Sequence, residues 1–200
     1  MQHSNQDEIS SHAFADWLSA GRPTFCGTDG GMKDDLGTFG FAWASSGANK
    51  QQFGQGKGRV PGTYLIMSST RAELGGAFAA LTYLQLIIAY YKVKLPYAFA
   101  VTLFCNSQAG LGQLKQINTN IALTQFSTTW RCRAHYDYKA ALKAAISTLP
   151  FPVHWKWIKG HAAQRKEPDK LTWPEHLKEL SDNFANAAYQ LLISEIDSDH

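Results

Sequence analysis

Four oxygen-bearing side chains, far apart in the chain, fall at the ends of elements that the sequence pattern predicts. Asp29 follows a first strand, Glu73 lies in the first turn of a long helix, Asn106 follows a buried strand, and Asp182 lies near the start of the last helix. His161 lies in the loop before that helix. Acidic residues gathered at strand ends suit a hard cation such as Mg²⁺, which prefers oxygen ligands and keeps several waters.

Two such ions, held about 3.5–4 Å apart, can activate water and stabilise the leaving oxygen of an in-line phosphodiester cleavage. Taken singly, each residue is a weak signal. Asp29 before Gly30-Gly31 is also ordinary turn chemistry. Thr70 with Glu73 fits the S/T-x-x-E capping box, which gives Glu73 a purely structural explanation. The order of the four residues on the strand and helix pattern is what favours a cation site.

Hydrophobic periodicity predicts the elements that must position these side chains. Three strands with short connections favour an antiparallel meander. Later strands are reached through helices, so we expect an α/β fold with a mixed five-stranded sheet, three antiparallel strands then two parallel ones, and helices on both faces. The predicted strands are 23–29, 38–44, one within 51–67, 98–105 and 153–158, and the predicted helices lie within 70–91, 108–123, 138–149 and 173–192.

Length and composition fit a single globular domain. The chain has 200 residues, of which 44% are hydrophobic, enough for a sizeable core. The formal net charge of +3 permits nucleic-acid binding without demanding it. We expect residues 1–11 to be a flexible lead-in, 12–21 a short helix packed on the main domain, 22–195 the domain itself and 196–200 a tail.

Cysteine usage and targeting signals limit the cellular setting. The odd count of cysteines, Cys26, Cys105 and Cys132, favours buried thiols over a disulfide framework. The amino terminus lacks the apolar core of a signal peptide. The most apolar helical run, 77–91, is too short to span a membrane. We therefore expect an intracellular protein, in the cytoplasm or nucleus, with no membrane partner.

The motifs around these residues resemble those of the ribonuclease H family, most closely the ribonuclease H domains of eukaryotic retroelement reverse transcriptases. They occur in the family's order over about residues 22–192. They are Thr28-Asp29-Gly30-Gly31, Thr70-Arg-Ala-Glu73-Leu, Leu103-Phe-Cys-Asn106-Ser-Gln-Ala, Trp157-Ile-Lys-Gly-His161 and Leu180-Ser-Asp182-Asn-Phe-Ala. The resemblance implies a ribonuclease H-like fold.

The resemblance also implies an endonuclease that hydrolyses the RNA strand of RNA/DNA hybrids with two Mg²⁺ or Mn²⁺ ions. Asp29, Glu73, position 106 and Asp182 match the family's four metal-binding acids. His161 matches the loop histidine that assists proton transfer or product release. The expected partner is an RNA/DNA hybrid, and the expected origin is either a larger reverse transcriptase polyprotein or a stand-alone fragment.

Asn106 departs from the family pattern, which has Asp at this position. The amide keeps the shape and offers one neutral oxygen, but it also presents an NH₂ donor toward the cations. It removes a negative charge from a site that must hold two dications. We therefore predict that the chain binds metal weakly and cleaves hybrids very slowly or not at all. An Asp→Asn exchange made to trap substrate and a natural loss both account for the residue.

Hybrid contacts are expected at phosphates and 2′-hydroxyl groups across the minor groove, not at base edges. For the basic, aromatic stretch 130–133 the alternative is a solvated charged face. For Ser107 and Gln108 the alternative is helix capping, and for His161 it is a histidine unrelated to catalysis. The candidate substrate-binding residues are Gly30, Gly31, Ser107, Gln108, Trp130, Arg131 and Arg133.

Two other function classes fit the same pattern. A non-catalytic nucleic-acid-binding or scaffolding domain would keep the fold and bind hybrids with a steep salt dependence, without cutting them even as Asn106→Asp. A two-metal DNA nuclease or transposase on the same fold fits less well, because of where Glu73 and His161 fall. Comparing hybrid, double-stranded DNA and double-stranded RNA substrates separates these classes.

Overall fold

The computed structural model describes residues 5–45, 52–63, 65–119 and 135–198. Helices and strands follow one another in the predicted order, with two short 3-10 helices, η1 and η2, before the last helix. The elements are α1 (Asn5–Ser19), β1 (Thr24–Lys33), β2 (Leu36–Ser45), β3 (Gln52–Arg59), α2 (Ser69–Tyr90), β4 (Val101–Cys105), α3 (Gln108–Thr119), α5 (Tyr136–Ser147), β5 (Val153–Trp157), η1 (Ala162–Gln164), η2 (Pro168–Lys170) and α6 (Trp173–Ser198).

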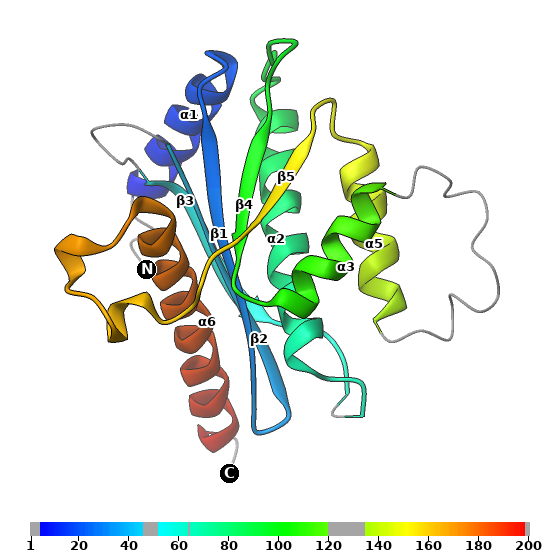
Figure 1. Cartoon of the computed structure of the whole chain (residues 1–200), viewed down its shortest axis with the longest axis vertical. Coiled ribbons are helices and arrows are strands. Elements are labelled where there is room, and N and C mark those ends of the chain that lie inside the picture. Colours follow the sequence, from blue (N-terminus) through cyan, green and yellow to red (C-terminus); the bar gives the residue numbers. More distant parts are fainter. Residues whose placement is uncertain (1–4, 46–51, 64, 120–134, 199–200) are drawn as a thin grey trace.

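A five-stranded sheet with the order β3-β2-β1-β4-β5 forms the centre of the molecule (Figure 1). Strands β1, β2 and β3 pair antiparallel, whereas β4 runs parallel to β1 and β5 runs parallel to β4. The predicted mixed sheet is confirmed. Short connections keep the first three strands antiparallel, whereas helical crossovers return the chain in the same direction for β4 and β5.

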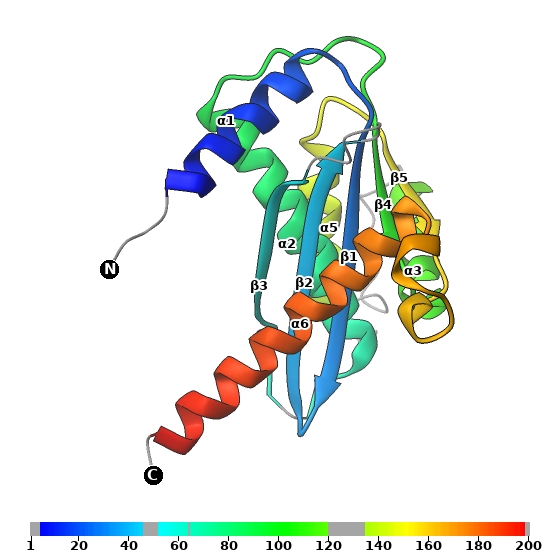
Figure 2. The same ribbon diagram turned by 90° about the vertical axis from the view of Figure 1, so that its left-hand side faces the viewer.

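Helices cover both faces of the sheet, with α2, α3 and α5 on one face and α6 on the other (Figures 1 and 2). Side chains along β2 point alternately to the two faces of the sheet, so the strand contributes to the packing on both sides. Trp43 packs into the large core on the α2 side, whereas Ala42 and Ala44 pack with Leu177 of α6. Because the α6 side of the sheet carries small residues, this helix lies close to the strands.

The two terminal helices are longer than predicted. Helix α1 begins at Asn5, whereas the predicted helix begins at residue 12, because its periodic apolar residues start only at Phe14. Phe14 stacks on Phe53 of β3 and Tyr83 of α2, so α1 covers that edge of the sheet. Helix α6 continues to Ser198, into the predicted tail, and its C-terminal end extends beyond the sheet (Figure 2).

Helix α2 is long and apolar enough to cross a membrane by length and composition, so the prediction that this run is too short was wrong. Packing explains its hydropathy. In its apolar window 56% of the residues are buried within the fold, and Leu74, Leu81 and Leu84 belong to the main core. These are the features of a core helix, and α2 is the central helix on its face of the sheet.

Strand β1 does not end at Asp29, as predicted, but continues to Lys33. Its antiparallel ladder with β2 runs the full length and closes in a tight turn, where Asp34 and Asp35 have φ angles of 48° and 58°. The parallel ladder with β4 stops at Phe104. Asp29 therefore lies just beyond the end of the β4 ladder, although its own strand goes on.

Candidate active site at the carboxyl end of β4

Asp29 projects from β1 toward α6. Residues at every second position of a strand share a face, and Phe25 packs in the core cluster on the α6 side. A Cβ placed on Gly27, on the same face, would lie 2.3 Å from the backbone oxygen of Leu177 in α6. The Asp29 side chain is thus buried between strand and helix, and its Oδ1 accepts a hydrogen bond from Lys178 Nζ.

Glu73 is the fifth residue of α2, just past the first turn in which it was predicted to lie, and it is buried against the end of β4. Cys105 Sγ donates a hydrogen bond to Glu73 Oε2 at 3.6 Å. The N-cap of α2 is Ser68, whose Oγ accepts the Arg71 backbone N–H at 3.0 Å. The predicted capping box of Thr70 with Glu73 was therefore wrong. Because Ser68 supplies the cap, the Glu73 carboxyl group is available to the cluster at the end of β4.

Asn106 follows β4 directly, and the loop after β5 covers it. Its backbone carbonyl accepts a hydrogen bond from Trp157 Nε1 at 3.0 Å. A Cβ on Gly160 would lie 2.8 Å from Asn106 Nδ2, which shows how closely the loop approaches. The Asn106 side-chain oxygen is buried and has no hydrogen-bond partner within the described part of the chain. A buried acceptor of this kind requires an explanation, which at a functional site is a ligand or a substituted residue.

Helix α6 supplies two charged side chains one turn apart, Lys178 and Asp182. Helix α6 begins at Trp173, as predicted, and Asp182 is its tenth residue. Lys178 is only 2% exposed and forms an ion pair with Asp29, while the half-buried Asp182 also hydrogen-bonds to Asp29. Our sequence reasoning missed Lys178. Its position beside Leu177, on the buried stripe and one turn before Asp182, is the signal that could have found it.

The acidic groups at the end of β4 raise one another's pKa values. Burial raises the pKa of Glu73 to about 8 against the opposing charge of Lys178, and the charge of Asp29 adds to the increase. Burial also raises the pKa of Asp182 to about 6, with further increases from its hydrogen bond to Asp29 and from the Asp29 charge. Burial raises the pKa of the Cys105 thiol well above its usual range, so this group is a neutral donor. Several acidic groups therefore surround a single ammonium group.

His161 lies at the N-terminal end of η1, in the loop between β5 and α6 as predicted. Its side chain is exposed and its backbone adopts a left-handed conformation with φ of 55°. The charge of His161 lowers the pKa of Asp182, so the imidazole is within electrostatic reach of the cluster. Its part in proton transfer or product release stays a prediction.

The divalent ions that the resemblance implies do not fit this cluster as it is arranged. The carboxylates are suitable ligands, but Asp29 is engaged by the Lys178 ammonium and position 106 carries a neutral amide. Across residues 5–45, 52–63, 65–119 and 135–198, no three His, Cys, Asp or Glu side chains are arranged to hold one metal ion. The requirement for Mg²⁺ or Mn²⁺ stays a prediction for an active form.

Gly30 and Gly31, both predicted to contact substrate, differ in their surroundings. A Cβ on Gly30 would lie 2.1 Å from the backbone of Ala72, so close packing of β1 on α2 explains this glycine without a substrate. A Cβ on Gly31 would meet nothing within 4 Å, which leaves this position open. Gly31 is thus the better placed of the two for a substrate contact, which stays a prediction.

The remaining residues predicted to contact substrate come directly after β4 or shortly before α5 in the sequence. Ser107 Oγ accepts the Gly110 backbone N–H at 3.0 Å, which is the capping role considered as its alternative. Gln108 is exposed at the start of α3. Trp130, Arg131 and Arg133 lie outside the described residues.

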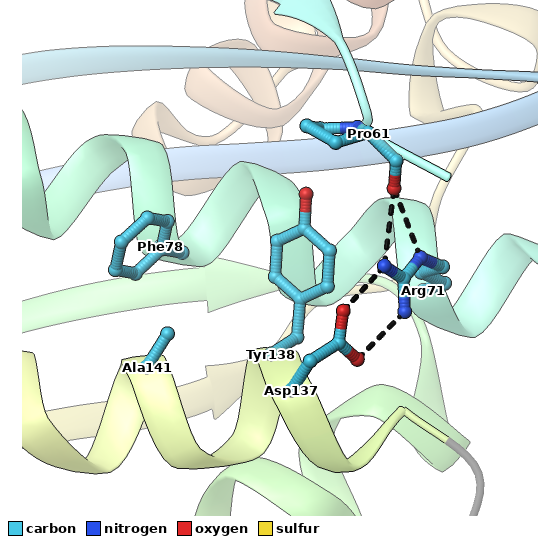
Figure 3. Close-up of a pocket in the computed structure, with 6 residues that line it drawn as sticks. All are labelled: Pro61, Arg71, Phe78, Asp137, Tyr138 and Ala141. Carbon is cyan, nitrogen blue, oxygen red and sulfur yellow. Dashed lines mark hydrogen bonds and ion pairs between the residues drawn. The ribbon is translucent and has the colours of Figure 1, made fainter.

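A second charged cluster joins the first turn of α2 to α5 (Figure 3). Arg71 donates to both Asp137 carboxylate oxygens, at 2.8 and 2.5 Å, and to the Pro61 carbonyl at 3.1 Å. Its guanidinium lies 4.6 Å from the centre of the Tyr138 ring. With Phe78 and Ala141 these residues line a pocket of about 250 Å³. Because the cation and the anion satisfy each other, this cluster is structural.

Comparison with solved structures places the fold of this chain among ribonuclease H structures. The solution structure of the prototype foamy virus ribonuclease H domain matches with a TM-score of 0.57 and 14% identity, over 85% of this chain and 94% of that one. LC11 ribonuclease H1, isolated from compost by a metagenomic approach, matches with a TM-score of 0.50 and 14% identity, over 84% of this chain and 99% of that one.

A third similar structure is the foamy viral protease–reverse transcriptase in complex with an RNA/DNA hybrid. It matches with a TM-score of 0.52 and 9% identity over 84% of this chain, which spans only 20% of that protein. No family model and no curated protein sequence matches the chain. The fold is therefore ribonuclease H-like, as the sequence motifs predict.

Proposed function

We propose that this chain is a ribonuclease H-type domain that binds RNA/DNA hybrids and whose cleavage of the RNA strand is impaired. The observation that carries the proposal is the convergence of Asp29, Glu73 and Asp182 from three elements at the end of β4, with Asn106 in the fourth position. The similarity in fold to a reverse transcriptase whose structure contains a hybrid supports the substrate class.

The proposed impairment follows from the charge of the site. A site that hydrolyses a phosphodiester must offset the charge that develops on the phosphate oxygens, and acidic residues serve this purpose by holding divalent ions. The amide of Asn106 contributes no charge and brings donor hydrogens toward the position of a cation. We therefore attribute two-metal hydrolysis to a form with Asn106→Asp and little of it to the chain as written.

The test is cleavage of an end-labelled RNA/DNA hybrid by this chain and by Asn106→Asp, in Mg²⁺ and in Mn²⁺. We expect very slow cleavage by the parent and a rate on the order of tenfold or more higher in the variant. Adding Asp29→Asn to the variant should abolish the gain, which excludes a contaminating nuclease. Equal and robust cleavage by the parent and the variant would contradict the proposed impairment.

A second candidate function, a non-catalytic hybrid-binding domain, is favoured by the ion pair between Lys178 and Asp29. Binding should then persist in chelator, weaken steeply with salt, and lead to no cutting even in Asn106→Asp. Affinities for hybrid, double-stranded DNA and double-stranded RNA, measured side by side, test the substrate class for both candidates. Preference for the hybrid is the expected result.

The similarity to a foamy viral reverse transcriptase also supports a setting within a larger reverse transcriptase, and an intracellular location stays a prediction. Such a setting would supply hybrid directly from the polymerase. Hybrid affinity that exceeds the affinity for either homoduplex is the first requirement of this setting, so the same comparison of substrates tests it.

A further inference from the structure

Lys178 is the buried cation of the carboxylate cluster, where it is paired with Asp29. Its side chain is 2% exposed, and its ammonium group donates to Asp29, which is itself 5% exposed. A charge buried to this extent persists only when it is paired, because desolvation is otherwise too costly. The pair is therefore part of the folded state.

The position of the ammonium group is fixed by the backbone of α6. The carbonyl of Leu177 lies against Gly27 in β1, and the carbonyl of Ser181 lies against Gly40 in β2. The Ser181 hydroxyl donates to the Lys178 carbonyl at 2.8 Å, within the same turn. The helix thus presents Lys178 to the cluster from a closely packed and well-defined position.

The ammonium group also acts on the other acidic residues. Its charge lowers the pKa of Glu73 and of Asp182, against the increases caused by burial and by Asp29. It therefore lies where a cation stabilises several carboxylates at once. A divalent ion bound to Asp29 would have to displace this ammonium group or accept its repulsion at close range.

We propose that the Lys178 ammonium group is the resident cation of this site and excludes divalent metal from Asp29, so that the domain is folded and competent to bind nucleic acid without metal. The exclusion is independent of the missing charge at Asn106. Restoring Asp at position 106 alone should therefore recover only part of the metal affinity. The inference deepens the proposed function, because it assigns a second cause of impairment to the same site.

The experiment is a Mn²⁺ titration of the full chain without nucleic acid. Binding is measured by calorimetry and by the electron paramagnetic resonance signal of free Mn²⁺. The forms compared are the parent, Lys178→Met, Asn106→Asp and the double variant. We expect Lys178→Met to bind Mn²⁺ on the order of tenfold more tightly than the parent and the double variant to bind most tightly of all. Equal affinity in the parent and Lys178→Met would overturn the proposal.

A control, a replacement variant and a further test keep the result interpretable. Lys143→Met removes another buried lysine, on α5, and should leave the Mn²⁺ affinity at the parental value. If Lys178→Met does not fold, Lys178→Gln replaces it. The parent itself gives a further test with Asp29→Asn: a loss of Mn²⁺ affinity would show that Asp29 already binds metal and would also overturn the proposal.

Hybrid binding in chelator is measured separately, so the two proposals can fail independently. Loss of the expected hybrid preference, with the Mn²⁺ results as expected, would reject the proposed function and leave the assignment of Lys178 intact. Tight Mn²⁺ binding by the parent, with hybrid preference retained, would reject the assignment of Lys178 alone.

Discussion

Arg71 in the first turn of α2 and Lys178 in α6 are both buried cations, and their surroundings differ in one respect. Arg71 faces a single carboxylate, that of Asp137, and fills its other donors with the Pro61 carbonyl. Lys178 faces a cluster in which Asp29, Glu73 and Asp182 all influence one another. In the first case the cation and anion balance. In the second the acidic groups outnumber the cation.

This difference separates a structural pair from the candidate functional site. Arg71 holds the pKa of Asp137 below its usual range, as expected for an anion with a good partner. In the cluster around Lys178, burial and mutual repulsion raise the pKa of Glu73 to about 8. Acidic groups kept together against their own repulsion are typical of sites that act on a ligand.

The largest expected effect comes from removing the anion of the buried pair. Asp29→Leu should lower the free energy of unfolding by about 3–5 kcal/mol, because it leaves the Lys178 charge buried without its partner. Urea denaturation followed by circular dichroism measures the change. The double variant Asp29→Leu/Lys178→Met should regain most of the loss. A double variant as unstable as the single one would show that the ion pair is not the cause.

A smaller effect is expected from pH. Because the pKa of Glu73 is about 8 when folded, above its ordinary value of 4.5, the folded state binds more protons than the unfolded chain between these values. Stability therefore falls as pH rises through this range. The parent should lose on the order of 3 kcal/mol relative to Glu73→Gln between about pH 4.5 and about pH 8. The free energy of unfolding of both proteins is measured against pH. If it changes with pH in the same way in the parent and in Glu73→Gln, the raised pKa of Glu73 is contradicted.

The balanced pair should respond in the opposite way. Asp137→Ala should cost about 1–2 kcal/mol, since Arg71 keeps the Pro61 carbonyl and Asp137 is largely exposed. Its pKa is lowered in the fold, so its contribution is lost only as pH falls below the ordinary range. The difference from the parent, measured by thermal unfolding, should stay constant from about pH 5 to about pH 8. If the stability lost in Asp137→Ala instead grows between these pH values, the Arg71–Asp137 pair does not differ from the Lys178 cluster in its response to pH.

The sequence predicts the sheet well because strand periodicity is local. The alternation in 38–44 and 153–157 depends only on which residues face a core, and β2 and β5 lie at these positions. It predicts the end of β1 badly, because Asp29 marks the end of the neighbouring ladder with β4, not the end of its own strand. Where a strand's neighbours stop is a tertiary property.

The same distinction applies to the candidate site. Asp29, Glu73, Asn106 and Asp182 could be found because a family motif surrounds each of them. Lys178 has no such motif, and its importance depends on Asp29, which is distant in sequence and near only in the fold. The cap of α2 was misassigned for a related reason, since Ser68 and Thr70 are both acceptable caps by residue type.

The glycines beneath α6 have a consequence for how the site can change. Because a Cβ on Gly40 would lie 2.2 Å from the Ser181 carbonyl oxygen, a substitution with Ala must lift the helix from the sheet. Lys178 and Asp182 share that helix, so such a movement withdraws the buried cation and a predicted metal ligand together. No rigid-body shift of α6 can open the site selectively. Only rotation of the Lys178 side chain can then exchange one cation for another. The close packing of α6 on Gly27 and Gly40 therefore fixes which cation the acidic residues face.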